Sequence, residues 1–212
     1  MFKKEYINIA NILTLSRVVC GIIFLFLFLY EKLYNPDPFI AIILESISLL
    51  IFIYAIISDG LDGYYARKIG HVTDFGKHFD PLSDSIFFII VFFTFWVIKL
   101  MPIYFFLVIL FRETFMHAFL RPYVRSKGST LPASIFGKIK TIFQSVFSLI
   151  ILSALIFKNL LLVLNVNWEA ITPAISIGSY VFFAIIVLLS VLSLLIYIID
   201  IRKNFSYRSK KV

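Results

Sequence analysis

Charge is scarce in this sequence. Only 15% of its 212 residues are Asp, Glu, Lys or Arg, whereas soluble domains carry about a quarter, and 61% are hydrophobic. This balance excludes a soluble globular domain, and also a disordered chain, which needs few apolar residues. Cysteine is nearly absent, with Cys20 alone, which excludes a disulfide scaffold. A cleavage signal is missing after the first apolar run, so we expect no secretory leader.

Long apolar runs are what the sequence has instead. A helix needs about 20 residues to cross the ~30 Å hydrocarbon core of a bilayer. Six runs approach or exceed that length: Ile9–Tyr30, Phe39–Arg67, Pro81–Leu100, Pro102–Leu120, Phe136–Phe157 and Ile175–Ile199. Between the last two we expect a loop or interfacial stretch, from Asn159 to Pro173. The sequence therefore predicts an all-α integral membrane protein: one domain over residues 1–212, with six transmembrane helices and an inner-face polar cavity.

Positive charges predict the orientation of these helices. Lys32, Lys99 and Lys158 lie beside the connections after the first, third and fifth runs, and the rest of the 20 Lys and Arg belong to the termini, the other connections or helix ends and interiors. Because cytoplasmic loops carry an excess of Lys and Arg, we expect both termini on the cytoplasmic side of the cell membrane. The net charge of +8 then indicates topology and attraction to anionic headgroups, and gives no support for nucleic acid binding.

Acidic residues are concentrated in one short stretch. Five of the twelve Asp and Glu lie between positions 59 and 84, where an even spread would place about one or two. They are Asp59, Asp62, Asp74, Asp80 and Asp84. Carboxylates near a bilayer are costly unless they are paired or bind ions. The stretch is therefore the first candidate for a functional site, with Asp74 assigned to a connecting loop.

The spacing of the other four predicts two helix faces. Asp59 and Asp62 are three residues apart, and Asp80 and Asp84 are four apart, so each pair shares a face. Three glycines leave room for the close approach of backbone or ligand: Gly60, Gly63 and Gly76. Oxygen ligands without Cys or His at ligand spacing favour Mg²⁺ or Mn²⁺, here as two ions, which clamp phosphates and activate an attacking oxygen. The alternative is a structural network at helix ends, with Asp80 favourable in a first turn.

The same stretch carries a longer pattern, D-x-x-D-G-x-x-A-R-x8-G-x3-D-x3-D. Every fixed position is filled: Asp59, Asp62, Gly63, Ala66, Arg67, Gly76, Asp80 and Asp84. The pattern resembles the signature of the CDP-alcohol phosphatidyltransferases. This resemblance implies a six-helix, homodimeric membrane enzyme that moves a phosphatidyl group from CDP-diacylglycerol to an alcohol and releases CMP. It also implies that the four Asp residues hold the metal ions, that Asp84 is the general base, and that the nucleotide is bound by Gly63, Ala66, Arg67 and Gly76.

The N-terminal stretch is similar to one subfamily, the bacterial phosphatidylglycerophosphate synthases. Residues 8–17 match their opening N-I-x-N-x-L-T-x-x-R. Asn11, Thr14 and Arg17 recur every three residues and would form a polar stripe toward the nucleotide, and we predict that Asn11 and Thr14 bind it. A helix cap and interfacial anchor is the alternative reading of these residues.

Two basic elements farther along resemble the same subfamily: Arg112-Glu113 within an apolar run, and residues 137–141, Gly-Lys-Ile-Lys-Thr. An Arg inside a span is costly unless it faces a polar cavity. We therefore predict four ligands for the phosphate of the acceptor: Arg112, Arg121, Lys138 and Lys140. The alternative is an Arg112–Glu113 packing pair with ordinary cytoplasmic lysines.

One departure concerns the second arginine of this element. The subfamily has it eight residues after the first, where this chain has Leu120, and Arg121 comes one residue later. One residue turns a side chain by about 100° on a continuous helix. The sequence therefore leaves open whether Arg121 faces the same cavity as Arg112.

The expected reaction is transfer of the phosphatidyl group from CDP-diacylglycerol to sn-glycerol 3-phosphate, giving phosphatidylglycerophosphate and CMP. Two alternatives stay open at this point. One is the same chemistry with another acceptor, such as inositol phosphate, choline or phosphatidylglycerol. The other is a cation-coupled transporter, because intramembrane carboxylates also coordinate transported ions.

Overall fold

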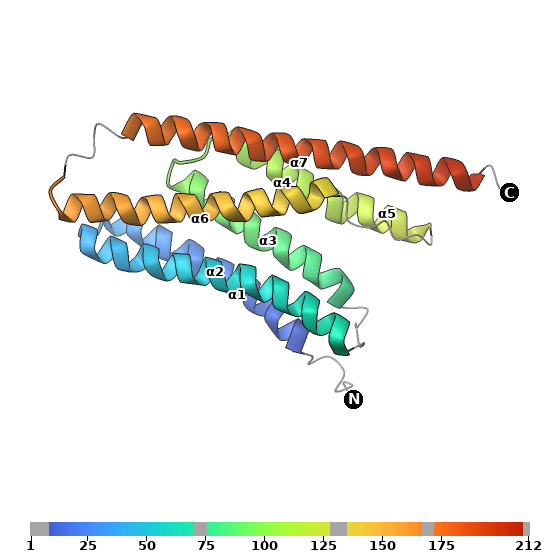
Figure 1. Ribbon diagram of the computed structural model, residues 1–212, viewed down its shortest axis with the longest axis horizontal. Coiled ribbons are helices and arrows are strands. Elements are labelled where there is room, and N and C mark those ends of the chain that lie inside the picture. Colours follow the sequence, from blue (N-terminus) through green and yellow to red (C-terminus); the bar gives the residue numbers. More distant parts are fainter. Residues whose placement is uncertain (1–8, 70–75, 128–134, 167–171, 210–212) are drawn as a thin grey trace.

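The chain is helical throughout the part that its structure describes (Figure 1). The computed structural model describes the backbone of residues 9–69, 76–127, 135–166 and 172–209, and the side chains of residues 12, 14–60, 82–127, 135, 137–166 and 176–203. The elements are α1 (Ile9–Tyr34), α2 (Pro38–Ile69), α3 (Gly76–Val97), α4 (Ile103–Phe115), the π-helical turn η2 (Met116–Leu120), α5 (Arg121–Ser126), α6 (Ile135–Val163) and α7 (Thr172–Ser209).

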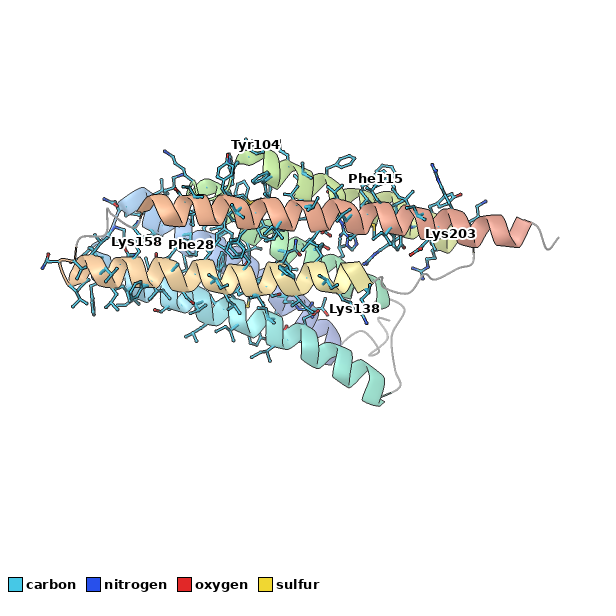
Figure 2. All side chains as sticks on the ribbon, turned by 45° about the horizontal axis from the view of Figure 1, so that its top comes forward. Phe28, Tyr104, Phe115, Lys138, Lys158 and Lys203 are labelled. Carbon is cyan, nitrogen blue, oxygen red and sulfur yellow. The ribbon has the colours of Figure 1, made fainter. Side chains whose placement is uncertain are left out.

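The long helices run along the long axis of the molecule in one bundle. α1 packs on α2 and α3, α2 on α6, α6 on α7, and α4 on α3 and α7. The α1–α2 and α3–α4 turns and the end of α6 lie at one end of the bundle, which we call the turn end. Lys158 lies at this end, and Lys138 and Lys203 lie at the opposite end (Figure 2), which we call the site end.

The predicted membrane character is confirmed, and the predicted count is met in part. Within the described residues, five helices are long and apolar enough to cross a bilayer: Thr14–Tyr34, Pro38–Gly60, Ile103–Ser126, Gly137–Val163 and Ser176–Lys203. The expected third span is represented by a shorter apolar helix, Leu82–Val97, about 24 Å long at 1.5 Å per residue. Large apolar side chains cover the outer surface, as a lipid-facing surface requires; Leu50 and Phe111, for example, are 66% and 64% exposed.

The expected connection from Asn159 to Pro173 is wrong at both ends. α6 continues to Val163 and α7 begins at Thr172. Asn159 does not end the helix because its side chain is buried in the bundle. The chain turns instead at Asn165, whose φ of 56° is left-handed, a conformation that Asn adopts more readily than most residues.

Phenylalanine rings join the helices at the centre of the bundle. Phe52 of α2 lies 6.5 Å from Phe24 of α1 and 5.6 Å from Phe87 of α3, measured between ring centroids. Phe183 of α7 stands edge-on to Phe92 of α3 at 6.4 Å. All five side chains are at most 1% exposed. Tilted and edge-on rings at these distances add to the stabilisation from burial, so this core holds α1, α2, α3 and α7 in register beneath the site.

Gly21 allows α1 to pack closely on α3. A Cβ built at Gly21 would lie 3.1 Å from Ile90 Cδ1 and 3.3 Å from Phe87 Cδ2, whereas one at Gly178 of α7 meets nothing within 4 Å. We predict that Gly21→Ala destabilises the protein by about 1–3 kcal/mol through overpacking. Gly178→Ala is not expected to destabilise it, since alanine is the better helix former. Thermal unfolding of both variants in one detergent tests this, and equal midpoints would contradict it.

Candidate active site

Asp59 is held by an arginine from the neighbouring helix. Arg17 of α1 is 1% exposed, and its Nη1 lies 3.0 Å from Asp59 Oδ1. Its Nε donates to Ser58 Oγ at 3.1 Å. A buried guanidinium with two fixed acceptors orients the carboxylate. The side chain of Asp59 is still 57% exposed, so it is accessible to a ligand.

The polar stripe predicted on α1 is partly described. Thr14, one helical turn before Arg17, is fully buried within the bundle. The side chain of Asn11 lies outside the described residues. Arg17 was expected to face a nucleotide, and it donates hydrogen bonds to Ser58 and Asp59. Its position therefore connects this stripe to the acidic stretch.

Asp84 of α3 lies in the same neighbourhood as Asp59. The two carboxylates repel each other electrostatically, while Arg17 and Lys140 attract Asp84. Two members of the acidic pattern, 25 residues apart in the chain, are thus brought together by adjacent helices. The side chains of the other predicted site residues in this stretch lie outside the described residues: Asp62, Gly63, Ala66, Arg67, Gly76 and Asp80.

The chemistry of this neighbourhood fits a hard divalent cation. Asp59 offers an exposed carboxylate, and its repulsion with Asp84 is relieved by any positive ion placed between them. Both donors are oxygens, which Mg²⁺ and Mn²⁺ prefer. Among the described side chains, a set that omits Asp62 and Asp80, no group of three or more His, Cys, Asp or Glu gathers closely enough to hold a metal.

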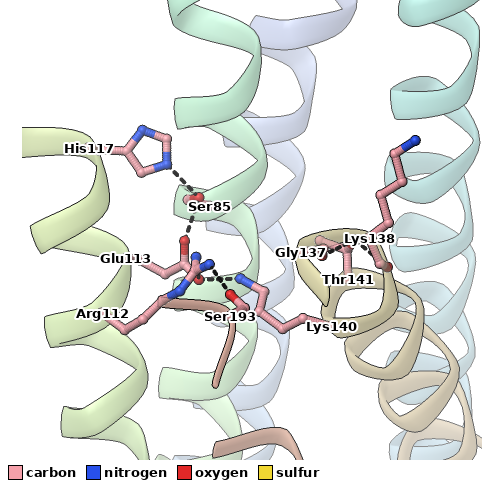
Figure 3. A network of polar contacts seen from close by, with 9 residues as sticks. All are labelled: Ser85, Arg112, Glu113, His117, Gly137, Lys138, Lys140, Thr141 and Ser193. Atoms are coloured by element: carbon pink, nitrogen blue, oxygen red, sulfur yellow. Dashed lines mark hydrogen bonds and ion pairs between the residues drawn. The ribbon is translucent and has the colours of Figure 1, made fainter. Parts of the chain in front are cut away.

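A buried network of charges lies beside Asp84 and connects five helical elements (Figure 3). At its centre is Glu113 of α4, whose Oε1 accepts from Arg112 Nη1 at 2.8 Å and from Lys140 Nζ of α6. Glu113 Oε2 accepts from Ser85 Oγ of α3 at 2.9 Å. Its members are Ser85, Arg112, Glu113, His117, Lys140 and Ser193.

The network carries more positive than negative charge. Arg112 and Lys140 are 7% and 5% exposed, and both are paired with the one carboxylate of Glu113. The second amino group of Arg112 donates to Ser193 Oγ at 2.6 Å. Among the described side chains, Arg112 Nε is buried without a hydrogen-bond partner. An unpaired donor on a buried cation is costly, and an anion bound here would supply both the acceptor and the missing charge.

The Arg112–Glu113 pair that the sequence offered as an alternative is thus formed, but within a larger cationic cluster. Lys140, one of the residues predicted to bind the acceptor phosphate, belongs to this cluster. Lys138 does not: it is exposed, and its ammonium points away from the network. Lys138 and Lys140 are two positions apart on α6, which corresponds to a rotation of about 200°, so they lie on different sides of the helix.

Arg121 follows a π turn that changes its direction. On a continuous α-helix, nine residues at about 100° each would place Arg112 and Arg121 on opposite sides. The η2 turn lies between them, and the Arg121 N–H donates to the carbonyl of Met116, five residues back. A π turn takes up one extra residue, so the two arginines are about 80° apart, as if the spacing were eight. Arg121 accordingly interacts electrostatically with Asp84 and Glu113.

Proline gives the π turn a local cause. Pro122 lies in the first turn of α5. In a continuous α-helix its ring would clash with the carbonyl of Ala118, four residues earlier, and it has no N–H to donate. A wider turn before Pro122 relieves that clash. The one-residue shift of Arg121, which the sequence left open, is therefore compensated by the backbone.

Sequence reasoning did not select Ser85, Glu113, His117 or Ser193 as site residues. Two of them had a usable signal: Glu113 belongs to the Arg112-Glu113 element, and His117, four residues later, shares its helix face. Its Nε2 lies 2.9 Å from Ser85 Oγ. Ser85 and Ser193 are two hydroxyls among many in apolar helices, and only the packing of α3, α4 and α7 identifies them.

Comparison with known proteins adds to this geometry. A family profile described as CDP-alcohol phosphatidyltransferase matches residues 7–199. A Bacillus subtilis (strain 168) protein named CDP-diacylglycerol–glycerol-3-phosphate 3-phosphatidyltransferase is 34% identical over 157 residues, covering 72% of this chain and 78% of that protein. A Treponema pallidum (strain Nichols) protein of the same name is 38% identical over 109 residues, 51% of this chain and 50% of that protein. The chain thus spans half the length of the second relative and 78% of the first.

Proposed function

We propose, from the premise that this chain belongs to the CDP-alcohol phosphatidyltransferase family, that it transfers the phosphatidyl group of CDP-diacylglycerol to sn-glycerol 3-phosphate. The products are phosphatidylglycerophosphate and CMP, and the process is phospholipid synthesis. The names of the B. subtilis and T. pallidum relatives support this acceptor. The observation that carries the proposal is that Asp59 and Asp84, two fixed positions of the acidic pattern, meet beside a buried cationic network.

The acceptor phosphate suits the charge of that network. Arg112, Lys140 and Arg121 outnumber Glu113, and Arg112 Nε has no partner within the described residues. A phosphate provides several acceptor oxygens to such donors. Glu113 then serves as a positioning residue that keeps Arg112 and Lys140 in place before the substrate arrives. Lys138, exposed at the start of α6, would attract the phosphate toward the cationic network without contacting it.

The metal site is proposed from the acidic pattern. Asp59, Asp62, Asp80 and Asp84 would hold one or two Mg²⁺ or Mn²⁺ ions, which neutralise the pyrophosphate of the donor when bound. Arg17 holds Asp59 in place through a hydrogen bond to Oδ1. Nucleotide contacts are assigned to Asn11, Thr14, Gly63, Ala66, Arg67 and Gly76. Among these, Thr14 lies one turn before Arg17 on α1, so it approaches the site from the same helix face.

The chemical step is a direct displacement at the β-phosphorus. The acceptor hydroxyl oxygen forms a bond to the phosphorus that carries diacylglycerol, and the bond from this phosphorus to the oxygen bridging to CMP breaks. Asp84 takes the hydroxyl proton, and CMP leaves with the bridging oxygen. A carboxylate positioned as general base is appropriate for this step, and Lys140 lies within electrostatic range of Asp84.

The membrane arrangement follows from the helices and their charges. We propose that α3, with its apolar part Leu82–Val97, is the sixth membrane helix, and that the chain is one domain. The site end faces the cytoplasm, because it carries most of the basic residues. There the water-soluble acceptor meets a lipid-anchored donor. The active form is proposed to be a homodimer.

Purified full-length protein tests the proposal through CMP release from CDP-diacylglycerol. With Mg²⁺, we expect release that depends on glycerol 3-phosphate, is abolished by EDTA, and is restored by excess Mg²⁺ or Mn²⁺. Inositol phosphate, serine, choline and phosphatidylglycerol form the comparison panel of acceptors. Preference for another acceptor would overturn the assigned substrate, and cation movement into liposomes without CMP release would overturn the enzyme.

A further inference from the structure

A cavity lies at the turn end of the bundle, at the opposite end from the candidate active site. It encloses about 510 Å³ between α3, α4, α6 and α7. Its inner wall is apolar, from Ile151, Ala154 and Leu155 of α6. Trp96 and Tyr180, which also line it, are 37% and 47% exposed, so the cavity opens on the apolar outer surface. A space of this size accommodates a lipid headgroup with the first part of a chain.

Two lysines give this cavity positive charge. Lys99 and Lys158 both line it, together with hydroxyl side chains that include Ser179, and its described lining residues include no acidic side chain. Lys158 is also in the electrostatic field of Glu31 and Glu45, which do not line the cavity. Within the described part of the chain, neither lysine forms a salt bridge within 4 Å. The cavity therefore combines apolar walls with a cationic rim.

Lys99 occupies a backbone position that favours glycine. After α3, the Lys99 N–H donates to the carbonyl of Trp96 and the Leu100 N–H to that of Phe95, both at 2.9 Å. This is the Schellman pattern, whose left-handed position is usually glycine. Lys99 occupies it with a φ of 65°. The two other non-glycine residues with positive φ in the described backbone, Asn35 and Asn165, are of a type that tolerates it.

We infer that this cavity binds a phospholipid with an anionic headgroup from the membrane leaflet at the turn end. The phosphate lies between Lys99 and Lys158, and its acyl chains leave past Trp96 and Tyr180. Amphipathic Trp and Tyr side chains favour the interface at which such a headgroup lies. Charge complementarity favours an anionic over a zwitterionic lipid, because each basic residue adds to the free energy of binding to anionic lipid. The site is separate from the reacting centre, so it does not depend on the proposed acceptor.

The test uses the purified full-length protein in a neutral detergent, titrated with phosphatidylglycerol or phosphatidylcholine and followed by native mass spectrometry. We expect phosphatidylglycerol to bind with at least about fivefold preference, and Lys99→Gly and Lys158→Gln each to weaken it about fivefold, equal to about 1 kcal/mol per lysine. Lys99→Gly is informative because glycine suits the left-handed position. Its thermal midpoint should be no lower than that of the unchanged protein, so lost binding cannot be ascribed to unfolding.

Two further variants separate charge from shape. Lys203→Gln removes one positive charge at the site end and is expected to leave lipid binding unchanged. Ala154→Phe fills the cavity from α6 without altering charge and is expected to weaken phosphatidylglycerol binding. The inference is overturned if Lys99→Gly binds the lipid as tightly as the unchanged chain, if phosphatidylcholine binds equally well, or if excess glycerol 3-phosphate displaces the lipid, which would indicate a site for a free phosphate.

Discussion

Asp84→Asn is expected to reduce CMP release by about a hundredfold to ten-thousandfold, the usual contribution of a general base. The amide keeps the shape and one oxygen of the carboxylate but cannot accept the hydroxyl proton. Asp84 is the described carboxylate that interacts with Asp59, Arg17 and Lys140 at once, so its charge is central to the site.

Substrate binding separates this role from a structural one. CDP-diacylglycerol affinity, measured by titration of the purified variant with Mg²⁺ present, should be largely retained while turnover is lost. Asp37→Asn is the matched control: Asp37 is exposed in the α1–α2 turn, where its Oδ1 accepts from the Phe39 N–H at 3.2 Å, and asparagine can keep that bond. A fully active Asp84→Asn protein would refute the base, and lost affinity with normal turnover would reassign Asp84 to binding.

Exchanging two neighbours, as Leu120→Arg with Arg121→Leu, is expected to raise the KM for glycerol 3-phosphate about tenfold to a hundredfold. The loss corresponds to a hydrogen bond made by a charged group. The exchange restores a spacing of eight from Arg112 but leaves the π turn of Met116–Leu120 in place. The arginine is therefore rotated by about 100° away from its original direction.

Deletion of Ala118 is expected to have a much smaller effect than the exchange. Ala118 is exposed within η2, and its removal both eliminates the extra residue and brings Arg121 to a spacing of eight. The spacing of eight then gives Arg121 the same direction relative to Arg112 without the extra residue, and the helix has only to bend at Pro122, whose ring clashes with the carbonyl four residues before it. A deletion that impairs acceptor use as severely as the exchange would contradict compensation by the π turn.

Initial rates against both substrates make this comparison specific. The KM for CDP-diacylglycerol should change little in either variant, since Arg121 is assigned to the acceptor. The control for the exchange is Phe119→Leu with Leu120→Phe, which swaps two apolar neighbours and moves no charge. A rise in both KM values with the control unaffected would point to a general disturbance of the site rather than to the acceptor phosphate.

Much of the fold could be predicted from local patterns in the sequence. Apolar runs of the right length identify membrane helices because the bilayer offers the backbone no hydrogen-bond partners, and a helix satisfies its own. Helix ends were less predictable. Asn159 reads as a breaker but is buried within α6, since packing between helices overrides the local preference of a single polar residue.

The candidate site also contains some residues that the sequence could predict and others that it could not. Asp59 and Asp84 could be selected because each belongs to a pair of carboxylates at helical spacing, and both pairs lie in one short stretch. Ser85 and Ser193 could not, because a hydroxyl in an apolar helix acquires a role only from the residue it faces, here Glu113 and Arg112. Lys138 and Lys140 looked equivalent in sequence, and the rotation of α6 separates them.

Residue type and short spacing account for the membrane character, the acidic pattern and the excess of cations. Helix packing and backbone geometry account for three further features: Arg17 holds Asp59, Glu113 gathers Arg112 and Lys140, and a π turn redirects Arg121. The first two join residues more than 20 positions apart, apart from the adjacent Arg112–Glu113 pair. Such contacts depend on how helices pack and rotate, which no local spacing specifies.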